Sequence, residues 1–127
     1  MNDKTKIKTV KLVRQIGSDV DWGVKENKQL IAGILVLKNE DEAKRFLRDL
    51  MTPLEIKEFG NRLEAASQLY RDVQYESITE STGLSSTTIA RIAKWLGGSL
   101  GGYRLILNRL GHHHNSSKLG KGLSLSS

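Results

Sequence analysis

Residues 75–96 read YESITESTGLSSTTIARIAKWL, and this stretch decides the fold. Apolar side chains occur at helical spacing before and after its one glycine, Gly83. A glycine accommodates the left-handed backbone that ends a helix, and a serine shortly after it can cap the next helix. The stretch therefore predicts two short helices joined at Gly83, with Ser85 or Ser86 as the cap. This spacing fits a helix-turn-helix, although a plain helical hairpin shares it.

The second of these helices, at about residues 86–96, has a polar side without acidic residues. If Ile89 and Ile92 face inward, the opposite side carries hydroxyl, small and basic side chains, and no Asp or Glu follows residue 80. Such a side suits a DNA major groove flanked by phosphates, and the helix N-terminus adds free amides. The candidate DNA-binding residues are Ser85, Ser86, Thr87, Thr88, Ala90, Arg91 and Lys94.

Helical periodicity also fills the centre of the chain. It predicts helices over about residues 24–38, from residue 40 to about 51, and from residue 53 to about 71. Asn39 and Thr52 are predicted caps, each followed three residues later by a glutamate, and Pro53 suits a first helical position. No stretch alternates with period two for long, so the predicted fold is an all-α multi-helix bundle. The expected core side of the third helix comprises Ile56, Phe59, Leu63, Ala66 and Tyr70.

The length of 127 residues suits one domain between two terminal segments. Residues 1–22 are predicted to form a basic, flexible arm, and residues 23–111 the helical domain. Residues 112–127 are rich in Ser, Gly and His, which predicts a disordered tail.

Composition excludes several classes of protein. A net charge of +6 favours a polyanionic partner, and no apolar run reaches the ~18–20 residues that span a bilayer.

Without cysteine there is no disulfide or thiolate metal site, which is compatible with the cytoplasm. We expect no metal site at His112 to His114, because adjacent histidines in a tail seldom form a closed site. Tight acidic groups occur only at residues 19–21 and 40–42, where a loop and helix capping explain them, so we expect no enzyme and no catalytic residue.

Two stretches together resemble the tryptophan-repressor superfamily. They are LMTPLEIKEFGNRLEAASQLYRD at residues 50–72 and the stretch at residues 75–96, followed by a glycine-rich step and an aromatic-basic helix ending in LILNRL. The similarity covers residues 27–110 and is closer to the repressor-related branch of small bacterial helix-turn-helix regulators. It implies an intertwined homodimer that offers two recognition helices about one duplex turn apart, ~34 Å. It also implies DNA contacts from the start of that helix, at Ser86, Thr87, Thr88 and Ala90.

The resemblance further implies an effector site. Thr52, Arg62 and Arg91 fall on positions that hold tryptophan in the repressor. Ile92 stands where the repressor has a glycine, and Trp95 stands where it has a serine that contacts the ligand. A branched side chain and a large indole would narrow that cavity and remove a polar anchor. We therefore expect no cofactor, and these departures count against tryptophan or a related small effector.

The sequence supports three hypotheses of different classes. The first is a sequence-specific, repressor-like transcriptional regulator that binds double-stranded DNA as a homodimer, in the cytoplasm at the nucleoid and not at a membrane. The second is a helical adaptor whose helix-turn-helix contacts protein. The third is a basic protein that coats nucleic acid without sequence preference, which predicts a steep salt dependence that relies on residues 4–14.

Overall fold

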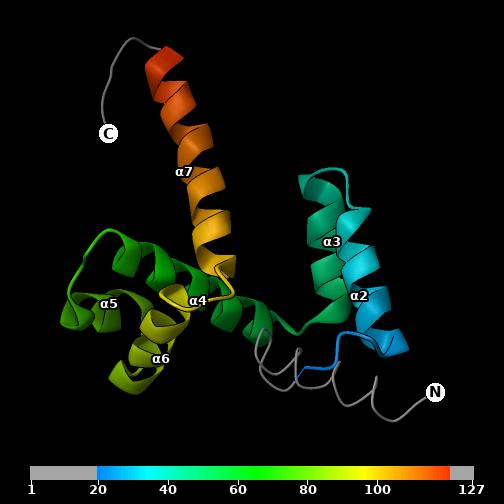
Figure 1. The fold of residues 1–127 in the computed structure, drawn as a ribbon, viewed down its shortest axis with the longest axis horizontal. Helices are drawn as coiled ribbons and strands as arrows, with labels where there is room; N and C mark the ends of the chain where they lie inside the picture. Colours follow the sequence, from blue (N-terminus) through cyan, green and yellow to red (C-terminus); the bar gives the residue numbers. More distant parts are fainter. Residues whose placement is uncertain (1–19, 121–127) are drawn as a thin grey trace. The chain divides into compact units, whose positions relative to one another are not determined.

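The computed structural model describes residues 20–120, and the side chains of residues 20–111. Within these residues it consists of six helices without a strand, which confirms the all-α prediction there (Figure 1). The chain divides into two compact units with the boundary after Lys57, and the helix at Pro53–Tyr70 contains that boundary. The helices are α2 (Lys25–Leu35), α3 (Glu40–Leu50), α4 (Pro53–Tyr70), α5 (Tyr75–Thr82), α6 (Ser86–Leu96) and α7 (Gly102–Gly120). None of the helices in this described part is long and apolar enough to cross a membrane.

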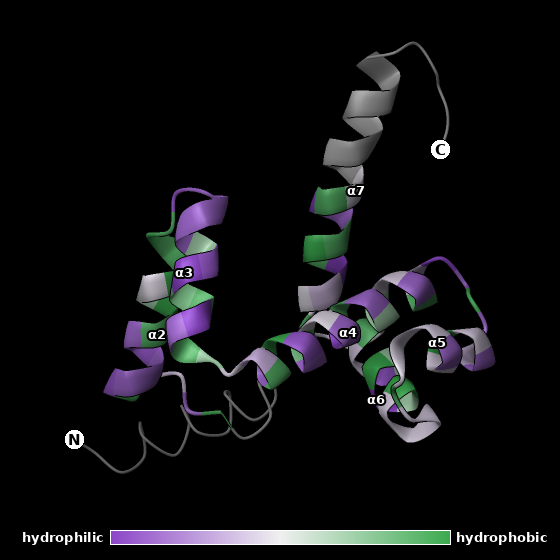
Figure 2. Ribbon diagram, turned by 180° about the vertical axis from the view of Figure 1, so that it is seen from behind, coloured by the Kyte–Doolittle hydropathy of each residue, from purple (hydrophilic) through white to green (hydrophobic). Residues whose placement is uncertain are grey.

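In the first unit, α2 and α3 lie side by side, and apolar residues occur along both (Figure 2). The ring of Phe46 on α3 lies 3.5 Å from the place that a Cβ would take on Gly33 of α2, so the small residue permits close packing. No residue of either helix is buried. The apolar sides of α2 and α3 therefore remain largely in contact with solvent in the single chain.

Both predicted caps in this unit are confirmed. The Asn39 side chain accepts a hydrogen bond from the Glu42 amide at 2.9 Å, and the Thr52 hydroxyl accepts one from the Glu55 amide at 3.1 Å. Glu55 in turn accepts a bond from the Thr52 amide at 2.9 Å, which completes a capping box. The helix predicted over about residues 24–38 is shorter in the structure, because α2 ends at Leu35. Residues 36–39 connect it to α3, and Asn39 has an extended backbone.

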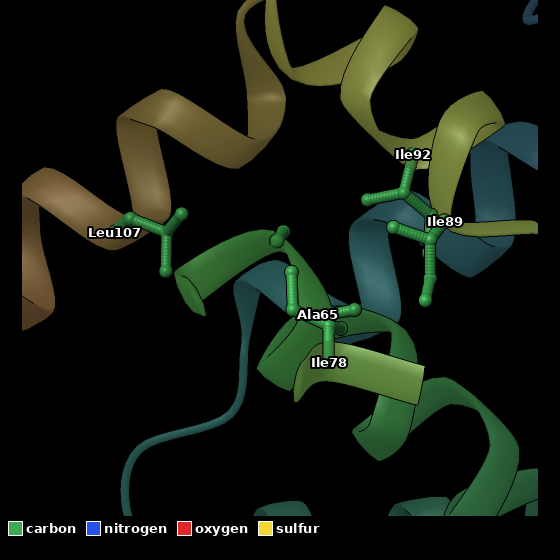
Figure 3. Packing of buried hydrophobic residues seen from close by; sticks show 6 residues of the cluster. Ala65, Ile78, Ile89, Ile92 and Leu107 are labelled. Carbon is green, nitrogen blue, oxygen red and sulfur yellow. The ribbon is translucent and has the colours of Figure 1, made fainter. Parts of the chain in front are cut away.

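The core of the second unit joins α4, α5, α6 and α7 (Figure 3). Three isoleucines, one from α5 and two from α6, are fully buried, and Ala65 and Ala66 of α4 pack against them because their short side chains let the helices approach closely. Leu107 joins the cluster from α7. The buried members are Ala65, Ala66, Ile78, Ile89, Ile92 and Leu107.

The expected core side of α4 was only partly right. Ala66 is buried and Leu63 packs against the core, but Phe59 and Tyr70 are each 44% exposed. Ala65 and Leu69 take the inward positions instead. The helix carries apolar residues on more than one side, so spacing alone did not identify the side that meets α5 and α6.

The C-terminal helix is longer than predicted. Composition placed a disordered tail at residues 112–127, whereas α7 continues through residues 112–120. Each residue added to an existing helix gains a backbone hydrogen bond, and no proline interrupts this segment. Residues 121–127, and residues 1–19 of the predicted basic arm, lie outside the described residues.

Two glycines provide a matched test of the turn between α5 and α6. Gly83 has φ +76° and Gly60 lies within α4, and a Cβ added at either would have nothing within 4 Å. Gly83→Ala should therefore lower the free energy of unfolding by about 1–2 kcal/mol through backbone strain alone. Gly60→Ala should raise it by up to about 1 kcal/mol, because alanine favours helix. Urea unfolding measures both, and equal effects of the two substitutions would contradict the role of Gly83.

Candidate nucleic-acid interface

The turn between α5 and α6 is held by a buried threonine. The Thr82 hydroxyl donates to the Ile78 carbonyl at 2.7 Å and accepts from the Leu84 amide at 3.2 Å. Gly83, in the left-handed conformation, donates its amide to the Thr79 carbonyl at 2.9 Å. Polar backbone groups buried at the turn are thus satisfied by one hydroxyl. The sequence pattern did not identify these two bonds.

Ser85 caps α6, as one of the two predicted alternatives. Its hydroxyl oxygen accepts from the Thr88 amide at 3.1 Å and its proton is donated to the Thr88 hydroxyl oxygen, with 3.0 Å between the two oxygens. Thr88 is accordingly half-buried and bonded within the protein. Of the four hydroxyl residues predicted to contact DNA, Ser85 and Thr88 are occupied by the cap, and Ser86 and Thr87 face solvent.

The solvent-facing side of α6 is a continuous strip along the helix, which we call the outer face. Its members lie opposite the buried Ile89 and Ile92 and follow the three- and four-residue spacing of one helix side. All of them are exposed. The outer face consists of Ser86, Thr87, Ala90, Arg91 and Lys94.

Charge is distributed very unevenly with respect to this helix. Up to residue 80 the chain has 14 Lys and Arg against 14 Asp and Glu, and beyond it six Lys and Arg against none. The whole net charge of +6 therefore belongs to residues 81–127, which include α6 and α7. The first turn of α6 contains no acidic residue, so its free amides and partial positive charge remain available to an anion.

The residues of the predicted effector site make different contacts. Arg62 pairs with Glu58 at 2.8 Å, and its guanidinium carbon lies 5.5 Å from the centre of the Phe59 ring. Its Nε is buried and has no hydrogen-bond partner among the described residues. Arg91 is exposed on α6. Thr52 belongs to the first unit, where it is bonded to Glu55.

The two departures from the repressor pattern also have distinct positions. Ile92 is fully buried in the core, whereas Trp95 is 45% exposed. The branched side chain of Ile92 thus serves packing against α5. Among the residues whose side chains are described, no group of three His, Asp or Glu side chains gathers to hold a metal ion. The side chains of His112 to His114 lie outside that part.

These features define an all-α protein in which a capped turn joins two short helices, and the second of them, α6, exposes a side without acidic residues. The profile of the family described as Trp repressor protein matches residues 25–111, and the chain belongs to that family. It is 38% identical over 86 residues to the uncharacterized protein YerC of Bacillus subtilis (strain 168), covering 68% of this chain and 83% of that protein. The crystal structure of a TrpR like protein from Eubacterium eligens ATCC 27750 matches with a TM-score of 0.67 and 37% identity, over 71% of this chain and 93% of that chain.

Tyr103 provides a pH-dependent test of the packing of α7 in this unit. Burial raises the pKa of its hydroxyl above the ordinary value, and the positive charge of Arg62 opposes part of that shift. The folded state thus holds the phenol proton to higher pH than the unfolded chain. Its contribution is fully present below the unfolded pKa of about 10 and is lost as the pH rises through the folded pKa.

We therefore expect the free energy of unfolding of Tyr103→Phe to fall less than that of the wild type between about pH 9.5 and 11. Urea titrations across this range measure it. Tyr75→Phe, which removes a phenol 42% exposed on α5, is the control for the loss of one tyrosine. Parallel curves for Tyr103→Phe and wild type would show that the phenol is not held in its protonated form by burial.

Proposed function

We propose that this protein is a sequence-specific DNA-binding transcriptional regulator, repressor-like in action, that inserts α6 into the major groove. One observation carries the proposal: α6 has a buried aliphatic side and an exposed outer face of hydroxyl, small and basic residues without a carboxylate. Membership of the Trp repressor family supports it. A regulator of this kind acts in the cytoplasm at the nucleoid.

The outer face divides into residues suited to bases and residues suited to phosphates. Thr87 and Ala90 lie near the start and middle of α6, where a hydroxyl can bond a base edge and a methyl group can contact thymine. Arg91 can donate two hydrogen bonds to a guanine, and Lys94, nearer the C-terminal end, suits a phosphate. The hydrogen bonds between Ser85 and Thr88 fix the first turn of α6. This turn can present its free amides to the phosphates of the DNA.

The first test replaces the free hydroxyl of Thr87. Thr87→Ala should weaken binding to a preferred duplex by about 1–3 kcal/mol while binding to random duplex changes little, because a base contact is lost. Thr87→Ser retains the hydroxyl and should restore most of the affinity. Anisotropy titrations with a duplex selected from genomic fragments and a random duplex of equal length measure both.

The competing functions predict other results. A protein that coats nucleic acid without sequence preference would bind the selected and random duplexes equally, with a steep salt dependence. A protein-binding adaptor would bind neither duplex at low salt. Either result, or a Thr87→Ala variant that discriminates as well as the wild type, contradicts base recognition by α6.

We further propose that the regulator is a homodimer formed through the first unit. Its helices bury no residue in the single chain, and Ile34, Leu35 and Val36 are 49%, 76% and 69% exposed. Residues 20–57 carry seven Lys or Arg and seven Asp or Glu, so two copies meet without net repulsion. Large apolar surfaces that are exposed in a soluble chain mark sites of association. A two-fold dimer presents two copies of α6 to successive turns of the duplex.

The dimer predicts a molecular mass in solution of twice 14.2 kDa. Ile34→Glu places a charge on the exposed apolar side of α2 and should shift the protein towards monomer at micromolar concentration, because desolvating an unpaired carboxylate is costly. Gln29→Glu, an exposed change that adds a charge of the same sign on a different side of α2 from Ile34, is the control. Sedimentation velocity measures the mass, and a wild-type protein that sediments as a monomer would refute the assembly.

A further inference from the structure

The C-terminal end of α6 is held by a side chain from the next helix. The Arg104 guanidinium on α7 donates through Nη1 to the Leu96 carbonyl and through Nη2 to the Gly98 carbonyl, the latter at 3.0 Å. The last carbonyls of a helix lack partners within that helix and carry partial negative charge. Arg104 is partly buried at this point, so its charge is directed at the protein and not at solvent.

The glycines between the two helices fit this contact. Gly101 has φ +71°, and a Cβ on it would lie 3.1 Å from Nη2 of Arg104. A Cβ on Gly98 would lie 3.3 Å from the Lys94 and Trp95 carbonyls. A larger residue at either place would displace the guanidinium or the end of α6. Gly102 differs, because a Cβ there has nothing within 4 Å.

We propose that Arg104 is a positioning residue for DNA recognition, which clamps the end of α6 onto α7 and thereby sets the angle at which the outer face enters the groove. This inference rests on the proposed function. The buried isoleucines fix how α6 is rotated about its own axis, and the clamp fixes the direction in which its axis points. Because α7 continues the core through Leu107, the clamp connects the recognition helix to the body of the second unit.

The experiment compares variants on a selected duplex and on a random duplex of equal length. Arg104→Gln should weaken binding to the selected duplex about tenfold or more, the effect of losing hydrogen bonds from a charged group. Binding to random duplex should change about threefold or less, because backbone attraction does not require a fixed helix angle. Arg104→Lys, which keeps the charge and donors, should restore part of the affinity. Gly101→Ala should reproduce the loss without removing any charge.

Two control variants and two further measurements separate positioning from charge and from folding. Arg109→Gln removes one charge from an exposed site on α7 and should weaken binding to the selected and the random duplex by the same factor. Gly102→Ala should bind as the wild type does, and thermal melting establishes that each variant is folded at the assay temperature. For Arg104→Gln the slope of log K against log salt should equal the wild-type slope. Loss of a direct phosphate contact would instead reduce the magnitude of this slope by about 0.9.

Each possible result either supports or overturns the role of Arg104. If Arg104→Gln unfolds, Gly101→Ala and Arg104→Lys carry the comparison. Folded variants that discriminate between the duplexes as the wild type does overturn the clamp, and so does a slope reduced by about one phosphate. A wild-type protein that binds the selected duplex while the variants are unaffected refutes the clamp alone. A wild-type protein that binds no duplex refutes the proposed function and, with it, the role of Arg104 in recognition.

Discussion

Burial of Ile89 and Ile92 on one side of α6 is the constraint on which the rest of the second unit depends. Each fully buried isoleucine contributes about 1.5–3 kcal/mol relative to exposure. Turning the helix by one residue would expose part of this apolar surface and bury a hydroxyl or a guanidinium without a partner. The direction of Thr87, Ala90 and Arg91 is therefore determined by packing on the opposite side. In the proposed regulator, residues on the outer face can therefore vary with the DNA sequence while the core keeps the helix in place.

The same core is small, which limits what the single chain can stabilise. Two of its six buried members are alanines, and it lies entirely in the second unit, whereas α2 and α3 bury nothing in the single chain. The caps at Asn39 and Thr52, which begin α3 and α4, contribute only about 1 kcal/mol each. In the proposed dimer, the free energy that the first unit lacks comes from association, so folding and assembly become linked to protein concentration.

Local chemistry explains which parts of the fold were predictable. The capping box at Thr52 and Glu55, the turn at Gly83 and the cap at Ser85 involve neighbours in sequence. The pattern alone identified the first two and limited the cap to Ser85 or Ser86. Features that depend on distant contacts were missed. The inward side of α4 depends on which side meets α5. The left-handed backbone at Asp72, just after α4, was missed because no glycine marks it.

The candidate site divides in the same way. The exposure of Thr87, Arg91 and Lys94 follows from helical spacing once the isoleucines face inward, so the sequence was sufficient to place them. The bond from Ser85 to Thr88 is also local, yet the spacing left open whether Thr88 is free or occupied. The clamp of Arg104 on the Leu96 carbonyl needs the path of the chain through its glycines, which no periodicity reports. A basic residue soon after a helix end was the available clue.

The division of charge fits the two roles proposed for the chain, association with its own copy and binding to DNA. A surface that meets its own copy by a two-fold axis places like charges near one another, which favours the balance of seven and seven found in residues 20–57. A surface that meets a polyanion gains from an excess of positive charge, which the chain confines to residues 81–127. Had the excess been spread evenly, attraction to DNA would have come with repulsion between the copies. Arg104 is one of these positive charges, and its guanidinium bonds carbonyls at the C-terminal end of α6, so it stabilises the helix that we propose to bind DNA.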